Sequence, residues 1–433
     1  MDKTPLLKKD GTQKLIASLL SILIGLVVGS IMVLIVGVST KDIGIKGAWD
    51  GIRLVFIGLF SGEKRSAAGE LTWAFNTTNI GNMLFRATPL IMTGLSVAVS
   101  QKTGLFNIGA PGQFLVGTMA TLMIALSIPS TSVPPAVVWL LAFLGGCLAG
   151  ALWGSIPGLL KAFLNINEVI ACIMTNWVAA VFVTWMFDIS QFSVMKGQYF
   201  CQNSWKIADG SFQNLLENTK SQYIYKTTWN NVATPKLGLD KIFPGSQVNA
   251  GILVAILIAV IVYVIINKST FGFQLKACGA NRHAARYAGI QDKANIVASM
   301  AIAGALAGGG AALYYLAGNT EFSWQTYQSL PAVGFNGIPV ALLAVNNPIG
   351  VIFSGLFMAM LDIIGTMIAK FTSYNEYITN VIIAVIVYFS AFSLVIRNLL
   401  NRKSKKSTVV ANDVNASPAP APDAKTEKGG AEK

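Results

Sequence analysis

The chain has 433 residues, of which 53% are hydrophobic and 12% are charged, with a mean hydropathy of +0.58 and a net charge of +13. Soluble domains carry about 25% charged residues, so this composition excludes a secreted disulfide scaffold, a coiled coil and a disordered chain, and argues against a cytosolic enzyme. It predicts an all-α polytopic membrane protein instead.

The first predicted element is a membrane span at residues 15–40, which contain no charged residue. This length exceeds the ~20 residues that a helix needs to cross a bilayer, and it exceeds the ~7–15 apolar residues of a cleavable signal. We therefore expect a retained helix. Lysines precede it within residues 1–14, which predicts a cytoplasmic N-terminus.

Further apolar segments follow the first. A charge-free run at 103–160 is too long for one helix, and Ser127, Pro129 and Pro134 mark a turn within it. The predicted spans lie at about 83–101, in the two halves of 103–160, and at about 167–187, 248–267, 294–317, 333–345, 347–369 and 375–397. About ten transmembrane helices in a membrane domain at 15–397 return the C-terminus to the cytoplasm, in agreement with the distribution of lysine and arginine.

Two loops and a tail complete the predicted organisation. An outer loop at about 189–247 is long enough to cover the structure or to receive a partner. A cytoplasmic loop at about 268–293 is short, basic and amphipathic. The tail at 398–433 is rich in lysine, alanine, proline and serine, and we expect it to be disordered and cytoplasmic. The surplus positive charge lies beside apolar segments, which indicates contact with anionic lipid rather than with nucleic acid.

Glycine and proline interrupt the apolar sequence at 104–113 and at 334–339, with a further interruption at 346–348. Such interruptions free backbone groups that must face protein or a water-filled cavity, and broken helices near mid-membrane often line a transport site. The neutral side chains in these segments suit a polar, uncharged solute, although they could equally bridge neighbouring helices. The similarity between residues 94–98 and 337–341 predicts a direct internal repeat whose copies run the same way.

Charged residues are rare in the predicted spans. Arg86 and Asp362 lie within or near spans and could pair, and Glu168 lies near the start of one. The spans contain no series of Asp, Glu and His that could relay protons, which argues against a proton-coupled transporter. The single histidine excludes a His-rich metal site, and the four cysteines, which lack CxxC spacing, are interpreted as structural.

Glycine recurs every four residues at Gly146, Gly150, Gly154 and Gly158. On a helix these positions form one smooth stripe, which lets the backbone of another helix approach closely. The pattern favours tight, static packing over a sliding gate.

Within residues 269–294, Asn281 fits the N-cap of a short helix that ends at Gly289. A short helix held between two spans could transmit force from a cytoplasmic partner, although a basic loop that only fixes the topology would have a similar composition. The phosphate-binding pattern GxxxxGK[ST] does not occur in the chain, so any use of ATP must come from another chain.

Three separated motifs carry a resemblance to a known family. They read ATPLIMTGLSVAVSQKTGLFNIGAPGQFLVG at 87–117, STFGFQLKACGANRHAARYAGI at 269–290 and GFNGIPVALLAVNNPIG at 334–350, and the segment NEVIACIMTNWVA at 167–179 also fits. Over residues 80–400 the chain resembles ABC importer permeases of the branched-chain amino acid, ribose and nucleoside superfamily. The resemblance is strongest to the nucleoside branch, whose members are also described as simple-sugar permeases.

The resemblance implies a non-catalytic transmembrane permease subunit of an ATP-driven importer in a bacterial plasma membrane. The subunit would translocate nucleosides delivered by an extracellular substrate-binding lipoprotein, beside a second, related permease. A cytoplasmic ABC ATPase would dock on the loop at 268–293 and would hold ATP and Mg²⁺, so no cofactor is expected in this chain. The alternatives are a permease for ribose or another simple sugar and, less favoured, an ion-coupled secondary transporter.

Two sets of candidate residues belong to this interpretation, and neither is catalytic. The substrate-pathway candidates are Phe106, Asn107, Gln113, Glu168, Asn176, Phe335 and Asn336. The ATPase-coupling candidates are Gly279, Asn281, Ala284, Ala285, Arg286 and Gly289. Neutral amide and aromatic side chains suit a ribose and a base, and they would equally suit a hexose.

Overall fold

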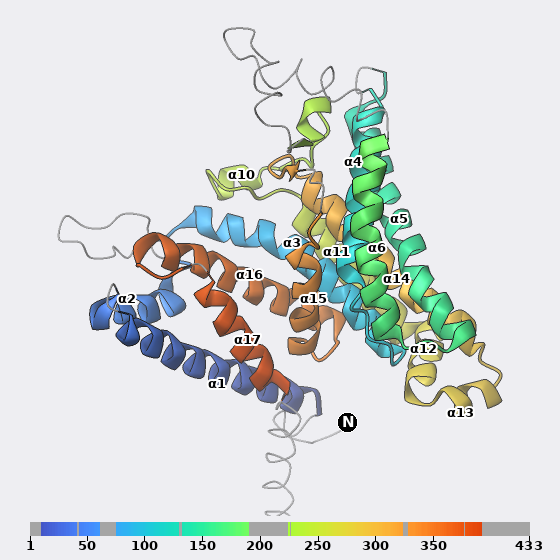
Figure 1. The fold of residues 1–433 in the computed structure, drawn as a ribbon, viewed down its shortest axis with the longest axis horizontal. Coiled ribbons are helices and arrows are strands. Elements are labelled where there is room, and N and C mark those ends of the chain that lie inside the picture. The colour runs from blue at the N-terminus through green and yellow to red at the C-terminus, as the bar shows by residue number, and fades with distance from the viewer. Residues whose placement is uncertain are drawn as a thin grey trace, which may run out of the picture.

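The structure is a computed structural model that describes residues 10–40, 43–60, 75–129, 132–189, 224–225, 227–323, 328–375 and 377–391. Throughout these residues the fold is helical, as the composition predicts, apart from one short antiparallel strand pair (Figure 1). The expectations for residues 1–9, for positions 190–223 of the outer loop and for the tail at 398–433 lie outside the described residues.

The N-terminal region contains α1 (Asp10–Ser39), α2 (Gly44–Ile57) and α3 (Thr77–Lys102). α1 coincides with the first predicted span, whereas α2 lies between the first and second predicted spans, where no helix was predicted. α2 packs against α1, and it buries Leu54 while leaving Trp49 exposed. Three charged residues lower the hydropathy of α2 below that of a span, which is why hydropathy alone did not predict this amphipathic helix.

The helices α4 (Ala110–Ser127), α5 (Pro135–Leu164) and α6 (Glu168–Ile189) lie side by side (Figure 1). The long charge-free run therefore turns where its prolines predict. Proline is favoured at the first position of α5 because its missing N–H is not needed there. Asn165 ends α5 in the left-handed conformation, with a φ of 54°.

The C-terminal half contains a short strand pair and a series of helices. β1 (Ile224–Tyr225) pairs antiparallel with β2 (Phe322–Ser323), with Ile224 opposite Ser323. The other elements are η2 (Thr227–Asn230), α10 (Leu239–Ile242), α11 (Gly251–Lys268), α12 (Thr270–Ala280), α13 (Arg282–Tyr287), α14 (Asp292–Tyr315), α15 (Ala332–Leu343), α16 (Pro348–Phe371) and α17 (Ile378–Ala391). Of these, α11, α14, α15, α16 and α17 occupy segments predicted as spans.

Seven helices within the described residues are long and apolar enough to cross a bilayer, namely α3, α4, α5, α6, α11, α14 and α16. α15 has only 12 residues, so it is about 18 Å long and shorter than the ~30 Å hydrocarbon core. The structure therefore describes a polytopic helical membrane protein. The count of ten spans and the cytoplasmic position of both termini stay predictions.

The glycine stripe of α5 faces α14, which also contacts α3 and α4. A Cβ atom at Gly150 would overlap the carbonyl oxygen of Gly304, and a Cβ at Gly304 would overlap the carbonyl oxygen of Gly150. Gly154 makes a similar contact with the backbone of Met300. The two helices therefore touch backbone to backbone, the close packing that the fourfold spacing predicts.

α15 runs parallel to the second half of α3. Thr93 of α3 donates a hydrogen bond to the carbonyl of Val333 at the start of α15 (3.2 Å), and Gln101 near the end of α3 accepts one from Asn346 just after α15 (2.7 Å). This parallel course agrees with the direction of the predicted direct repeat.

The position of the second helix interruption was predicted wrongly in part. Residues 334–339 lie inside α15 and do not break it. The chain leaves the helix after α15, where Val345 and Asn346 have positive φ angles of 51° and 55°. The glycines inside α15 instead permit close contacts, since a Cβ at Gly334 or Gly337 would overlap a neighbouring helix.

Candidate functional site

The non-helical segment between α3 and α4 folds back along α3. After α3 ends, the chain turns at Gly104, where φ is 71°, and reaches Asn107, whose Nδ2 donates to the Oγ of Ser96 (3.0 Å). Ser96 lies six residues before the end of α3, which is about 9 Å along the helix. α4 therefore begins well inside the bundle rather than at the level where α3 ends.

Three predicted pathway residues form one buried hydrogen-bond cluster at this helix start. Asn107 Nδ2 donates to Gln113 Oε1 (2.8 Å), and Asn107 Oδ1 accepts from Gln113 Nε2 (3.1 Å) and from the Gly109 N–H (3.0 Å). Asn176 on α6 accepts from an N–H in the first turn of α4 (2.9 Å) and donates to the carbonyl of Ile108 (3.0 Å). The cluster satisfies backbone groups that the interruption frees.

α15 begins beside the start of α4. A Cβ at Gly334 in α15 would overlap the backbone of Pro111 in α4. Thr93, which bonds to the first turn of α15, lies nine residues before the end of α3, about 14 Å along the helix. Two helix starts therefore meet inside the bundle, an arrangement found where broken helices line the substrate path of a transporter.

The side chains of the other four pathway candidates are not part of this hydrogen-bond cluster. Phe335 and Asn336 are exposed on one side of α15, and Phe106 is half-buried against the main apolar core. Glu168 at the start of α6 forms an ion pair with Lys161 near the end of α5 (2.8 Å). The structure thus separates a buried amide cluster, an exposed pair on α15 and an ion-paired carboxylate.

Asn107→Leu is expected to destabilise the protein by about 2 kcal/mol or more, because it leaves the Gly109 N–H and the Gln113 side chain without their buried partner. The melting temperature of the purified chain in detergent measures this loss. Asn380→Leu on α17 is the matched control, since Asn380 is exposed. An unchanged melting temperature with lost transport would assign Asn107 to solute contact instead.

The helices α12 and α13 project beyond the ends of α5 and α6 (Figure 1). Ser269 caps α12 by accepting from the Gly272 N–H (3.0 Å), and Asn281 caps α13 by accepting from the Ala284 N–H (3.0 Å). Gly289 follows α13 with a φ of 80°. The short helix expected in this segment is therefore present, and Asn281 caps it as predicted.

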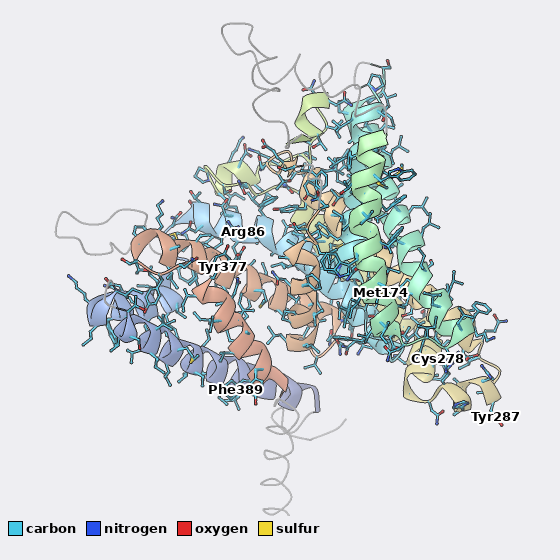
Figure 2. All side chains as sticks on the ribbon, viewed as in Figure 1. Arg86, Met174, Cys278, Tyr287, Tyr377 and Phe389 are labelled. Carbon is cyan, nitrogen blue, oxygen red and sulfur yellow. The ribbon has the colours of Figure 1, made fainter. Side chains whose placement is uncertain are left out.

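The coupling candidates on α13 differ in exposure. Ala285 is buried, whereas Ala284 and Arg286 are exposed. Tyr287, which was not among the candidates, is 95% exposed and points away from the bundle (Figure 2). Tyrosine is enriched among the residues that contribute most to binding at protein interfaces, and this one is exposed to a partner.

Asp292 at the start of α14 anchors α13. Its carboxylate accepts hydrogen bonds from Arg282 Nε (2.6 Å), from Arg286 Nη2 (2.9 Å) and from Arg286 Nε (3.3 Å), and its side chain is 7% exposed. The hydrogen bond to Asp292 raises the pKa of the Arg286 guanidinium, which stays charged. Asp292 was not among the candidates predicted from the sequence, although it is an acidic residue at the end of a basic segment.

α12 and α14 both contact the turn that follows α3. A Cβ at Gly279 would overlap the carbonyl oxygen of Lys102, so the two backbones touch. The hydroxyls of Thr103 and Ser299 share a hydrogen bond of 2.6 Å. α12 and α14 therefore both touch the segment that leads to Asn107.

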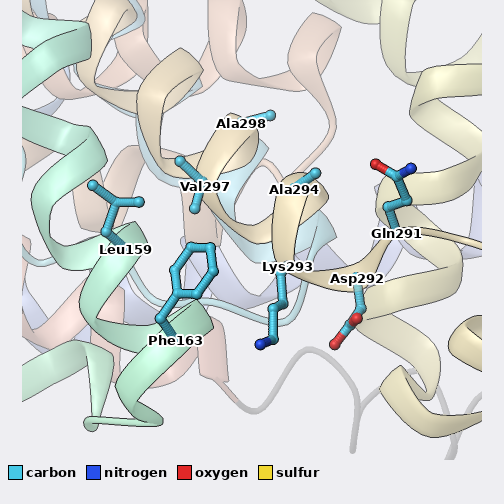
Figure 3. Close-up of a pocket in the computed structure, with 8 residues that line it drawn as sticks. All are labelled: Leu159, Phe163, Gln291, Asp292, Lys293, Ala294, Val297 and Ala298. Carbon is cyan, nitrogen blue, oxygen red and sulfur yellow. The ribbon is translucent and has the colours of Figure 1, made fainter.

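A groove of about 700 Å³ lies next to this anchor, where α5 meets α14 (Figure 3). Leu159 and Phe163 from α5 and Val297 from α14 form apolar walls. Lys293 Nζ lies 5.0 Å from the centroid of the Phe163 ring, within the range of a cation–π interaction. Among the described residues, no group of three or more His, Cys, Asp or Glu side chains is placed to hold a metal ion.

Apolar spanning helices, two helix starts that meet inside the bundle, and a capped helix beyond its end define a membrane transport subunit. The chain belongs to the family described as the permease component of the branched-chain amino acid transport system, whose model matches residues 79–391.

Three relatives that carry transport names match most of the chain. The guanosine ABC transporter permease protein NupP of Bacillus subtilis is 33% identical over 395 residues, covering 90% of this chain and 97% of NupP. The nucleoside ABC transporter permease protein NupB of Lactococcus lactis is 33% identical over 390 residues, with 90% and 94% covered. The glucose ABC transporter permease protein TsgB13 of Haloferax volcanii is 30% identical over 319 residues, with 74% and 77% covered. No solved structure matches the chain.

Proposed function

We propose that the chain is the permease subunit of an ATP-driven importer that moves nucleosides into a bacterial cell across the plasma membrane. The observation that carries the transport mechanism is the direct contact of α12 and α14 with the turn before the interrupted start of α4. The match to guanosine and nucleoside permeases over 90% of the chain supports the substrate class.

The proposed mechanism begins at α13. An ABC ATPase on the cytoplasmic side docks on α13, with Tyr287 as an anchor, and holds ATP and Mg²⁺ on its own chain. Asp292 carries the movement of α13 to α14, and Gly279 carries it to the turn that follows α3. This chain then shifts a helix start and makes no covalent bond, so it requires no cofactor.

The substrate path follows the interrupted helices. We assign Asn107, Gln113 and Asn176 to holding the start of α4 in place, because all three side chains are buried and bonded to protein. Phe335 and Asn336 on the exposed side of α15 are the groups that meet the solute. A second, related permease faces this path, and an extracellular binding lipoprotein delivers the nucleoside.

Uptake of labelled uridine, guanosine and ribose into cells with and without the gene tests this proposal, before and after ATP depletion and with the ion gradients held. We expect uptake of both nucleosides that needs the gene and ATP. Uptake that follows an ion gradient and survives ATP depletion would exclude the ATP-driven mechanism.

A simple-sugar substrate is the second candidate, and the similarity to a glucose permease favours it. Excess unlabelled ribose separates the two candidates. We expect it to leave guanosine uptake unchanged, whereas strong competition would move the substrate class to sugars.

A further inference from the structure

An ion pair joins α3 and α16, two helices that are long and apolar enough to cross a bilayer. Arg86 Nη1 on α3 lies 2.6 Å from Asp362 Oδ2 on α16 (Figure 2 labels Arg86). Arg86 is nine residues from the start of α3 and Asp362 is nine residues from the end of α16. Each side chain is therefore about 14 Å from that end of its helix, level with the start of α11, where Gly251 approaches Thr88, and with the end of α14, where Tyr314 stacks on Phe85.

Both side chains are open to their surroundings. The side chain of Arg86 is 35% exposed and that of Asp362 is 55% exposed. Charged groups within a membrane-spanning segment face the interior of a helix bundle or a water-filled cavity, because contact with hydrocarbon is costly. The pair therefore marks a face of α3 and α16 that meets water or protein in the assembled transporter.

The geometry of the pair leaves most of its hydrogen-bonding capacity unused. The two side chains share a single hydrogen bond, from Nη1 to Oδ2. Among the described residues neither side chain has a second partner, so Asp362 Oδ1 and four of the five guanidinium N–H groups are available. A purely structural Arg–Asp link would favour the bidentate arrangement, which is the stronger one.

We propose that Asp362 and Arg86 form a binding station for the vicinal hydroxyl groups of the transported solute. This inference rests on the proposed function and deepens it. A carboxylate accepts one hydrogen bond on each oxygen, which matches two adjacent hydroxyls of a ribose. The guanidinium donates to oxygen or nitrogen acceptors of the same molecule. The solute replaces one hydrogen bond within the pair and gains several.

An aromatic group beside the pair suits the base of a nucleoside. The ring of Phe85, the residue before Arg86, stacks on Tyr314 of α14 with their centroids 5.7 Å apart. Phe85 is buried and Tyr314 is partly exposed. A partly exposed ring next to a station for hydroxyl groups favours a solute with both a sugar and a flat base.

The station predicts a preference for ribonucleosides over 2′-deoxyribonucleosides. A site that hydrogen-bonds a hydroxyl rejects an analogue without it, because the site's polar groups are then left unpaired. The binding protein also selects the solute. When the same binding protein is present throughout, a change between permease variants in the ratio of the ribonucleoside and deoxyribonucleoside uptake rates therefore reports the selectivity of the permease itself.

The test compares initial uptake rates of labelled uridine and 2′-deoxyuridine by the complete transporter in proteoliposomes. We expect Asp362→Asn to lower uridine uptake at least about tenfold and to bring the ratio of the two rates towards one. Asp240→Asn is the control, since Asp240 is exposed on the short helix α10. A ratio that stays at the wild-type value in Asp362→Asn would overturn the proposal.

A charge-reversed double variant, Arg86→Asp with Asp362→Arg, separates binding from a structural link. It restores the ion pair, so we expect assembly with the other subunits and the melting temperature to recover, while uridine uptake stays low. Recovery of uptake would identify the pair as a structural link only. Loss of the second permease from the purified Asp362→Asn complex would identify it as a subunit contact.

The proposed function and this inference can fail separately. A wild-type transporter that imports a sugar and no nucleoside would overturn the nucleoside proposal. In that case, Asp362→Asn would still be expected to lower uptake of the sugar, which also carries vicinal hydroxyls. Normal sugar uptake by the variant would overturn the binding station as well.

Discussion

Gly150→Ala is expected to destabilise the helix bundle by about 3 kcal/mol, the upper part of the usual range for an overpacked core. The added Cβ would overlap the carbonyl oxygen of Gly304 on α14. No side-chain rotation can relieve this overlap, because the opposing atom belongs to the backbone. α5 and α14 must move apart, and α14 also contacts α3 and α4. The melting temperature in detergent measures the effect.

Leu148→Ala is the matched control for this prediction. Leu148 lies on the same helix and is 61% exposed, so its change to alanine should alter stability by about 0.5 kcal/mol or less. Equal losses in the two variants would mean that α5 is sensitive to any substitution. A melting temperature unchanged by Gly150→Ala would contradict the backbone contact between α5 and α14.

The positions of most helices could be predicted because a span is defined by local properties. Charge-free length and proline placed the turn between α4 and α5 correctly. α2 was not predicted because its apolar residues share one face only when the chain is helical. Along the sequence, Asp50 and Arg53 lie between these apolar residues and lower the local hydropathy. Residues 334–339 were misjudged because glycine serves two purposes, since it can break a helix or permit close packing.

Individual residues of the candidate site could be predicted from the sequence, but the contacts between them could not. The motifs singled out Asn107 and Asn176, yet the contacts that join them to one helix start connect different helices. Arg86 and Asp362 are 276 positions apart, so their pairing could only be left open. Hydropathy and spacing describe one helix at a time, and these contacts depend on how helices meet.

Asp292→Asn is expected to lower uptake at least tenfold while the complex still hydrolyses ATP. An uncharged amide cannot replace the charge-assisted bonds that hold both Arg282 and Arg286. The Asn281 cap of α13 is independent of Asp292, so the surface that meets the ATPase stays folded. Because Arg286 is exposed, its charge is hydrated when the bond is lost, and the chain remains stable. The measured quantity is solute imported per ATP hydrolysed.

Two further variants determine which step depends on Asp292. Asp292→Glu keeps the charge and should recover part of the uptake, whereas Asp240→Asn on the exposed α10 should leave the ratio unchanged. If Asp292→Asn lost ATP hydrolysis together with uptake, the residue would be needed for docking the ATPase. If both rates stayed normal, α13 would act on the bundle through the backbone contact of Gly279 alone. Solute import per ATP therefore separates the side-chain route through α14 from the backbone route through α12.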